Sequence, residues 1–137
     1  ARLSKALQGE NEYSIFAKSA GAVLAIYGVS TGALKPERCV FAGLPIKWAD
    51  KNKFPLKEWL EKFDVPTILV EQSKDPVGPY AEVQAYVAEL EISSIKIIEI
   101  PGNDHDYNDL AAIKALVQEF LLGKEKEKNI ESRLTKR

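Results

Sequence analysis

Ala17-Lys18-Ser19-Ala20-Gly21 is the most informative stretch of this sequence. It follows an apolar run over residues 13–17 that predicts a strand, and it leads into a helical pattern over residues 19–29. The residues two before and two after the serine, Ala17 and Gly21, are both small. A serine on a tight turn from strand to helix, between small residues, is the pattern of a nucleophile elbow.

One position departs from that pattern. The usual sequence is G-x-S-x-G, and this chain has Ala17 at the first glycine position. Alanine is the smallest substitute, but it tolerates a positive φ angle poorly. The alternative role for Ser19 is a plain helix N-cap.

Composition excludes several classes of protein. The chain has 137 residues, which favours one domain, and its 45% hydrophobic and 28% charged residues are typical of a globular protein. A net charge of −1 gives no electrostatic reason to expect a nucleic acid or an anionic membrane as partner. The single cysteine, Cys39, lies in a predicted strand and rules out a disulfide framework or a cysteine-rich zinc site.

The sequence shows no sign of a membrane span or a secretory signal. No apolar run approaches the roughly 18 residues of a membrane-spanning helix, and no secretory signal opens the sequence. We therefore expect a cytoplasmic protein with no membrane partner. We also expect no cofactor and no metal.

Strand and helix patterns alternate four times along the chain. Strands are predicted at 13–17, 37–42, 67–71 and 94–100, and helices at 19–29, 56–63, 79–90 and 109–122, with a looser polar stretch at 47–55 and a short helical pattern at 1–7. This alternation predicts an α/β fold: a mostly parallel sheet of about four strands with helices on both faces. We expect one α/β domain over residues 1–122 and a polar tail over residues 123–137.

Three residues that could take part in catalysis follow the predicted strands. Ser19 follows the first strand, Asp75 the third, and His105, the only histidine, the fourth. Because the carboxyl ends of parallel strands meet at one edge of a sheet, the three side chains are expected near one another. Their order along the chain is serine, acid, histidine, as in the serine hydrolases of this architecture.

Each of the three residue types has a chemical role in such a hydrolase. A serine hydroxyl is a weak nucleophile until a base removes its proton, and histidine titrates near neutrality. A carboxylate behind the imidazole fixes its tautomer. We assign Ser19 as nucleophile, His105 as general base and acid, and Asp75 as the orienting carboxylate. The alternatives without catalysis are that His105 is a solvated loop residue and that Asp75 starts a turn before Pro76.

Two other carboxylates flank the histidine and compete for the orienting role. Asp104 and Asp106 are its immediate neighbours in sequence. Sequence neighbours rarely point into the same ring, whereas Asp75 lies at its own strand end. We therefore favour Asp75.

With these residues the sequence resembles the carboxyl-terminal half of the α/β-hydrolase family. The likeness rests on the elbow at 16–22, the strand and acid turn at 65–77 and the histidine loop at 100–105, and it covers residues from about 13 to 120. It implies a serine hydrolase of the esterase or thioesterase kind, acting on a small-molecule ester or thioester through an acyl-enzyme on Ser19. The backbone N–H of Ala20 would be the first oxyanion donor. One departure is Gln72-Ser73, where a glycine-bearing turn is common in the family.

The resemblance also implies strands that precede the elbow strand, whereas only the short segment before Tyr13 precedes it in this sequence. The loop that gives the second oxyanion donor is among the missing parts. The elbow strand would then present an unpaired apolar edge. We therefore expect a missing N-terminal segment of a longer protein, or self-association or a partner at that sheet edge.

Two other functional classes stay open. One is a non-catalytic α/β-hydrolase-like fragment or binding module that keeps the three residues without a complete oxyanion hole. The other is a flavodoxin-like or nucleotide-binding domain. It is disfavoured because residues 17–21 lack the G-x-x-x-x-G-K-S/T spacing of a phosphate loop.

Overall fold

Four parallel strands form the sheet in a computed structural model that describes residues 13–108, 112–115 and 117–118. They are β1 (Ser14–Lys18), β2 (Arg38–Ala42), β3 (Thr67–Gln72) and β4 (Ile95–Ile100), in the spatial order β1-β2-β3-β4. The register places Lys18 beside Ala42, Ala42 beside Val70 and Val70 beside Ile98. The four strands therefore end along one edge, and the predicted parallel sheet is confirmed.

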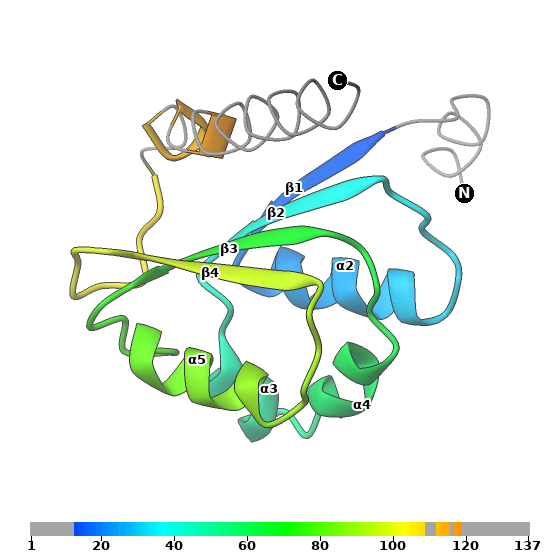
Figure 1. The fold of residues 1–137 in the computed structure, drawn as a ribbon. Helices are drawn as coiled ribbons and strands as arrows, with labels where there is room; N and C mark the ends of the chain where they lie inside the picture. Colours follow the sequence, from blue (N-terminus) through cyan, green and yellow to red (C-terminus); the bar gives the residue numbers. More distant parts are fainter. Residues whose placement is uncertain (1–12, 109–111, 116, 119–137) are drawn as a thin grey trace, which may run out of the picture. The chain divides into compact units, whose positions relative to one another are not determined.

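The helices between the strands lie on one face of the sheet (Figure 1). They are α2 (Ala20–Ser30), α3 (Ile46–Lys51), α4 (Leu56–Glu61) and α5 (Tyr80–Ala88). Crossovers between parallel strands are right-handed, so crossovers that always advance in the same direction place their helices on the same side. Helices were expected on both faces. All four of these helices lie on one face, and the presence of a helix on the second face stays a prediction.

The α3 helix is a difference from the sequence prediction, which had a loose polar stretch at residues 47–55. Its six residues include only one buried side chain, Ala49, while Lys47, Asp50 and Lys51 are exposed. A helix of fewer than two turns shows no apolar periodicity, because the pattern needs about 11 residues to appear.

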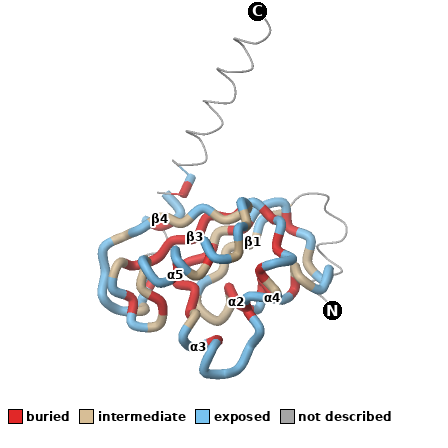
Figure 2. Tube along the Cα trace, turned by 60° about the horizontal axis from the view of Figure 1, so that its bottom comes forward, coloured by how far each residue is buried: buried red, intermediate tan, exposed pale blue. Residues whose placement is uncertain are grey.

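The core lies between the sheet and these helices (Figure 2). Phe41 at its centre is 1% exposed and packs against Phe63 with ring centroids 6.1 Å apart. Cys39 is also buried there, and burial raises the pKa of its thiol to about 11. It is therefore a small core residue, as the sequence indicated, and not a reactive thiolate at neutral pH.

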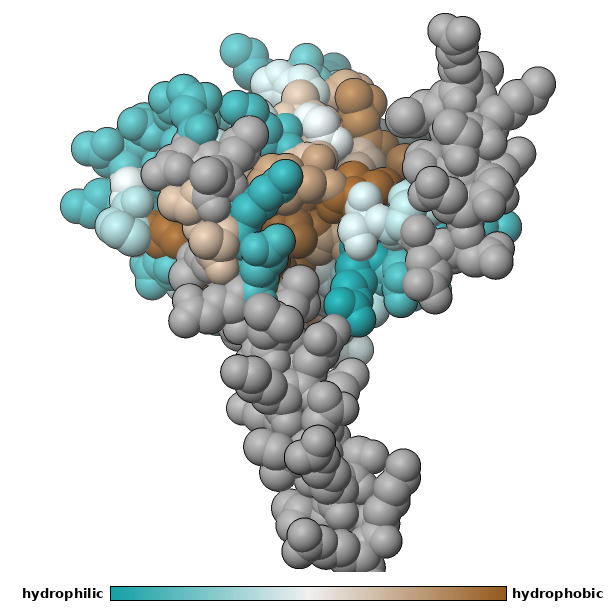
Figure 3. All heavy atoms as spheres, turned by 90° about the horizontal axis from the view of Figure 1, so that it is seen from above, coloured by the Kyte–Doolittle hydropathy of each residue, from teal (hydrophilic) through white to brown (hydrophobic). Residues whose placement is uncertain are grey.

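Apolar residues also occupy the face of the sheet turned away from α2 to α5 (Figure 3). Successive strand residues alternate between the two faces. Leu69 belongs to the core cluster on the helix side, whereas Ile68 and Val70 beside it do not, although both are buried. Burial of every residue of β3 agrees with the continuous apolar run seen in the sequence.

The chain divides into two units, Ala1–Tyr107 and Asn108–Arg137, and the sheet belongs to the first. In the second unit, residues 112–115 and 117–118 are helical, within the helix predicted at 109–122. The predicted helix at 1–7 and the predicted tail at 123–137 lie outside the described residues. In the described ranges, no helix has the length and apolar character needed to cross a membrane.

Core packing in β3 leads to a first prediction. Leu69 is 1% exposed, so Leu69→Ala should lower the free energy of unfolding by about 2–5 kcal/mol through lost burial and the cavity left behind. Leu24→Ala on α2 is the matched control, because Leu24 is 68% exposed. Urea denaturation measures both. Equal losses for the two variants would contradict the position of the core.

Candidate functional site

Ser19 sits at the turn between β1 and α2 with φ 53° and ψ −127°. A positive φ is costly for a residue with a side chain and persists only where the surroundings enforce it. One enforcing contact is the Ser19 N–H, which donates to the carbonyl oxygen of Ala42 at 2.9 Å. Ser19 occupies the N-cap position of α2, but its hydroxyl makes no capping hydrogen bond to the helix.

The small residues around the elbow face each other. A Cβ built on Gly21 would lie 3.7 Å from the Cβ of Ala17, which is ordinary contact distance. Alanine therefore fits where the family pattern has glycine, because the positive φ falls on Ser19 and not on Ala17.

Asp75 lies in the loop after β3 and is fully buried. Its Oδ1 accepts a hydrogen bond from the Val77 N–H at 2.8 Å. Its Oδ2 accepts from the Tyr107 hydroxyl at 2.8 Å and lies 2.8 Å from Nδ1 of His105. These three donors satisfy a carboxylate that has no access to water.

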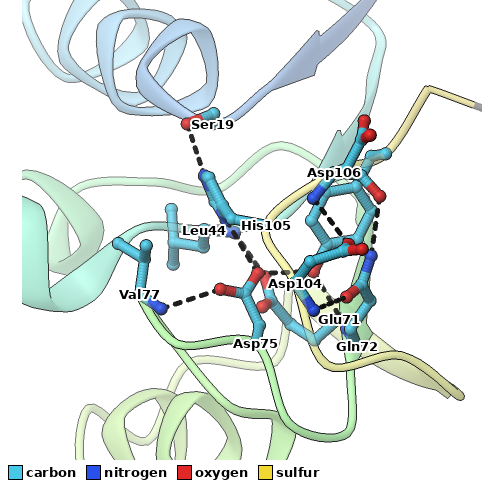
Figure 4. Close-up of polar contacts among 10 residues, drawn as sticks. Ser19, Leu44, Glu71, Gln72, Asp75, Val77, Asp104, His105 and Asp106 are labelled. Atoms are coloured by element: carbon cyan, nitrogen blue, oxygen red, sulfur yellow. Dashed lines mark hydrogen bonds and ion pairs between the residues drawn. The ribbon is translucent and has the colours of Figure 1, made fainter.

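His105 joins the other two residues (Figure 4). Its Nε2 lies 2.6 Å from Oγ of Ser19, while Nδ1 faces Asp75. The imidazole is 22% exposed. In this arrangement, an imidazole that carries its proton on Nδ1 can donate it to the carboxylate, which leaves Nε2 able to accept a hydrogen bond from the hydroxyl. The structure thus brings together the three residues singled out from the sequence.

Neither of the competing carboxylates is the one that faces the His105 ring. Asp104 Oδ1 accepts the N–H of Asp106 at 2.9 Å, which closes a local turn. Asp106 offers its backbone carbonyl to the side chain of Gln72. The described contacts of the His105 ring therefore include Asp75 and neither neighbour.

Tyr107 is a member of the site that the sequence analysis missed. Its hydroxyl accepts from the Gln72 backbone N–H at 2.9 Å and donates to Asp75. The residue is 3% exposed, and burial, followed by the nearby Glu71 carboxyl, raises the pKa of the phenol well above its usual range. The hydroxyl therefore stays a hydrogen-bond donor to Asp75 at any ordinary pH.

Glu71 is a second missed member. It is fully buried, and its Oε1 accepts the backbone N–H of Leu44. Among the described residues, its Oε2 has no hydrogen-bond partner. Burial, with a smaller contribution from the Asp75 charge, raises the pKa of Glu71 to about 9. Glu71 is thus neutral at pH 7 and adds no second negative charge beside Asp75.

A sequence signal existed for only some of these residues. Glu71 and Gln72 are polar side chains that close an otherwise apolar, buried strand, and polar residues in such a place need partners. Tyr107 carries no comparable local signal, because its partners, Gln72 and Asp75, belong to a distant part of the chain.

A groove of about 520 Å³ lies among α3, α4 and α5, away from the three residues. It is lined in part by Ile46, Phe54 and Tyr86, and none of Ser19, Asp75 or His105 borders it. In the part of the chain that is described, no group of three or more His, Cys, Asp or Glu side chains is arranged to hold a metal ion.

Contact between Gly43 and Tyr107 generates a second prediction. Gly43 has φ +72°, and an added Cβ would lie 2.4 Å from the Tyr107 ring. Gly32 has a similar φ of +82° with no atom within 4 Å of an added Cβ, so Gly32→Ala is the matched control for backbone strain alone. Gly43→Ala should lose about 1–3 kcal/mol more unfolding free energy than the control in urea denaturation. Equal losses would show that the ring does not pack there.

Protonation of Glu71 generates a third prediction. The folded protein holds this proton up to about pH 9, whereas the unfolded chain releases it near the ordinary value of 4.5. The unfolding free energy should therefore fall as the pH rises from about 4.5 to about 9, by about 1.4 kcal/mol per pH unit at most. Glu71→Gln has no proton to release, so its stability relative to the wild type should increase with pH. Urea denaturation at about pH 6 and pH 8.5 tests this, and a constant difference would refute it.

Comparison with known proteins supports the fold. No protein-family model matches the chain, and no curated protein matches it in sequence. Among solved structures, the chain is similar to Est1E from Butyrivibrio proteoclasticus, with a TM-score of 0.70 and 14% identity over 91% of this chain and 66% of that one. It is also similar to the esterase domain of a Rhodothermus marinus protein, with a TM-score of 0.59 and 11% identity over 75% of this chain and 56% of that one.

A third similar structure is a puromycin hydrolase mutant complexed with PGG, with a TM-score of 0.54 and 16% identity over 77% of this chain and 21% of that one. The chain thus spans about two thirds or less of the length of these proteins. Such likenesses show the fold, and together with the strand order, the elbow and the strand-end loops they lead to one conclusion: this chain has the α/β-hydrolase fold.

Proposed function

We propose that this chain is a serine hydrolase that cleaves small carboxylic esters or thioesters through an acyl-enzyme on Ser19. One observation carries the proposal: the His105 ring faces Ser19 Oγ at 2.6 Å on one side and Asp75 Oδ2 at 2.8 Å on the other. Nucleophile, base and orienting acid are thus within hydrogen-bond reach in the order that the chemistry needs.

The first half of the reaction forms the acyl-enzyme. Ser19 Oγ attacks the substrate carbonyl carbon while its proton passes to Nε2 of His105. Asp75 stabilises the imidazolium that results. When the tetrahedral intermediate collapses, the bond to the alkoxide or thiolate breaks and His105 returns the proton to that leaving group. In the second half, His105 activates a water that releases the acid and restores Ser19.

The oxyanion of the intermediate needs donors aimed at it. Ala20 is the first residue of α2, and N–H groups in the first turn of a helix have no acceptor inside the helix. Its N–H follows the nucleophile directly, which is the position of the first oxyanion donor in this architecture. Loss of one oxyanion donor typically costs about 10²- to 10³-fold in turnover, so the rate is expected to depend strongly on a second donor.

Labelling with a fluorophosphonate tests the proposal. Wild-type protein should be labelled at Ser19, and Ser19→Ala and His105→Ala should lose both labelling and hydrolysis of a short p-nitrophenyl ester, by about 10⁴-fold or more. Ser30→Ala is the matched control, because Ser30 lies at the other end of α2 and its hydroxyl bonds the Tyr27 carbonyl. It should react like the wild type.

Two outcomes would speak against this function. Hydrolysis by Ser19→Ala at the wild-type rate would remove Ser19 from the mechanism. A folded wild-type protein that is neither labelled nor active would favour the non-catalytic module.

A further inference from the structure

Gln72, the last residue of β3, contacts the backbone on both sides of His105. Its Nε2 donates to the Asp106 carbonyl oxygen at 2.7 Å, and its Oε1 accepts the Asp104 N–H at 3.1 Å. His105 lies between these two residues, so one side-chain amide spans the segment that carries the imidazole (Figure 4).

The backbone of the same residue reaches the acid. The Gln72 N–H donates to the Tyr107 hydroxyl at 2.9 Å, and that hydroxyl donates to Asp75. The Gln72 side chain thus binds the two residues that flank His105, and its main chain binds the Tyr107 hydroxyl that donates to Asp75.

The histidine loop is closely packed on this amide. An added Cβ on Gly102 would lie 2.5 Å from Cδ and Oε1 of Gln72. Gln72 itself is only 5% exposed, so its polar atoms depend on these loop contacts for their hydrogen bonds.

We propose that Gln72 is a positioning residue that holds the His105 imidazole in line between Ser19 and Asp75. This inference rests on the proposed function for its catalytic consequence. It also assigns a role to the position where the sequence departs from the glycine-bearing turn common in the family.

The chemistry of the side chain explains why glutamine suits the position. Holding a loop in one conformation costs conformational entropy for each residue fixed, so the loop needs bonds to a rigid element. A strand end is rigid, and an amide offers a donor and an acceptor at once. Methionine has a similar length but neither group, and glutamate has no donor when ionised.

Kinetics separate a positioning role from a purely structural one. Gln72→Met should lower kcat for the p-nitrophenyl ester by about 10- to 100-fold with little change in KM, at a temperature where circular dichroism shows a folded protein. Gln84→Met is the matched control, because Gln84 is exposed on α5. A folded Gln72→Met protein with wild-type kcat would overturn the proposal.

A spectroscopic readout needs no catalysis. His105 is the only histidine, so its ring gives a single set of NMR signals. The Nδ1 proton shared with Asp75 should appear far downfield in the wild type and broaden or disappear, through faster exchange with water, in Gln72→Met and Gln72→Glu. An unchanged proton signal in either folded variant would contradict the inference.

Amide exchange covers the case in which neither variant folds. In the full wild-type chain, the Asp104 N–H should be protected because it binds Gln72 Oε1. Exchange at the rate of a free loop amide would overturn the proposal. These two readouts remain informative if the wild type proves inactive, so failure of the proposed function and failure of the Gln72 inference are distinguishable.

Discussion

Burial of the Asp75 carboxylate dictates how the loops of the site are arranged. A charge removed from water is tolerated only when donors surround it, and Asp75 has three, from Val77, His105 and Tyr107. One donor comes from its own loop and two come from the histidine loop. Satisfying this one group therefore fixes two loops that are separated in the chain by α5 and β4, and it places the imidazole where it meets Ser19.

The end of β3 acts as the anchor for those loops. Successive residues of a strand point to opposite faces, so Glu71 and Gln72 reach in different directions. Glu71 binds the turn after β2 through the Leu44 N–H, and Gln72 binds the loop after β4. Because Glu71 is buried and neutral, it supplies this support without adding a negative charge that would compete with Asp75 for the imidazole. The end of β3 thus holds the two loops in place and leaves Asp75 as the charged partner of the imidazole.

Much of the fold could be predicted because its signals are local. The strands and the longer helices could be recognised from the spacing of their apolar residues, and the small residues around Ser19 indicated a tight turn. The α3 helix was missed because six residues are too few to display a period. Gln72 appeared in the sequence only as a departure from a familiar turn, and Tyr107 did not stand out. Their contacts join the end of β3 to the loop after β4, and pairings between such distant segments leave no trace in a single sequence.

The order of strands and helices, the parallel sheet that this order implies, and the serine, acid and histidine after three of the strands could all be inferred from the sequence alone. Tertiary structure decided that Asp75 rather than Asp104 or Asp106 faces the imidazole, that Glu71 is neutral, and that Gln72 binds the backbone on both sides of His105. The difference lies in the distance along the chain over which each kind of signal acts. Periodicity and turn preferences act over a few residues, whereas a hydrogen bond or a burial-driven pKa shift requires atoms placed to within a fraction of an ångström, and only the packing of distant segments places them so.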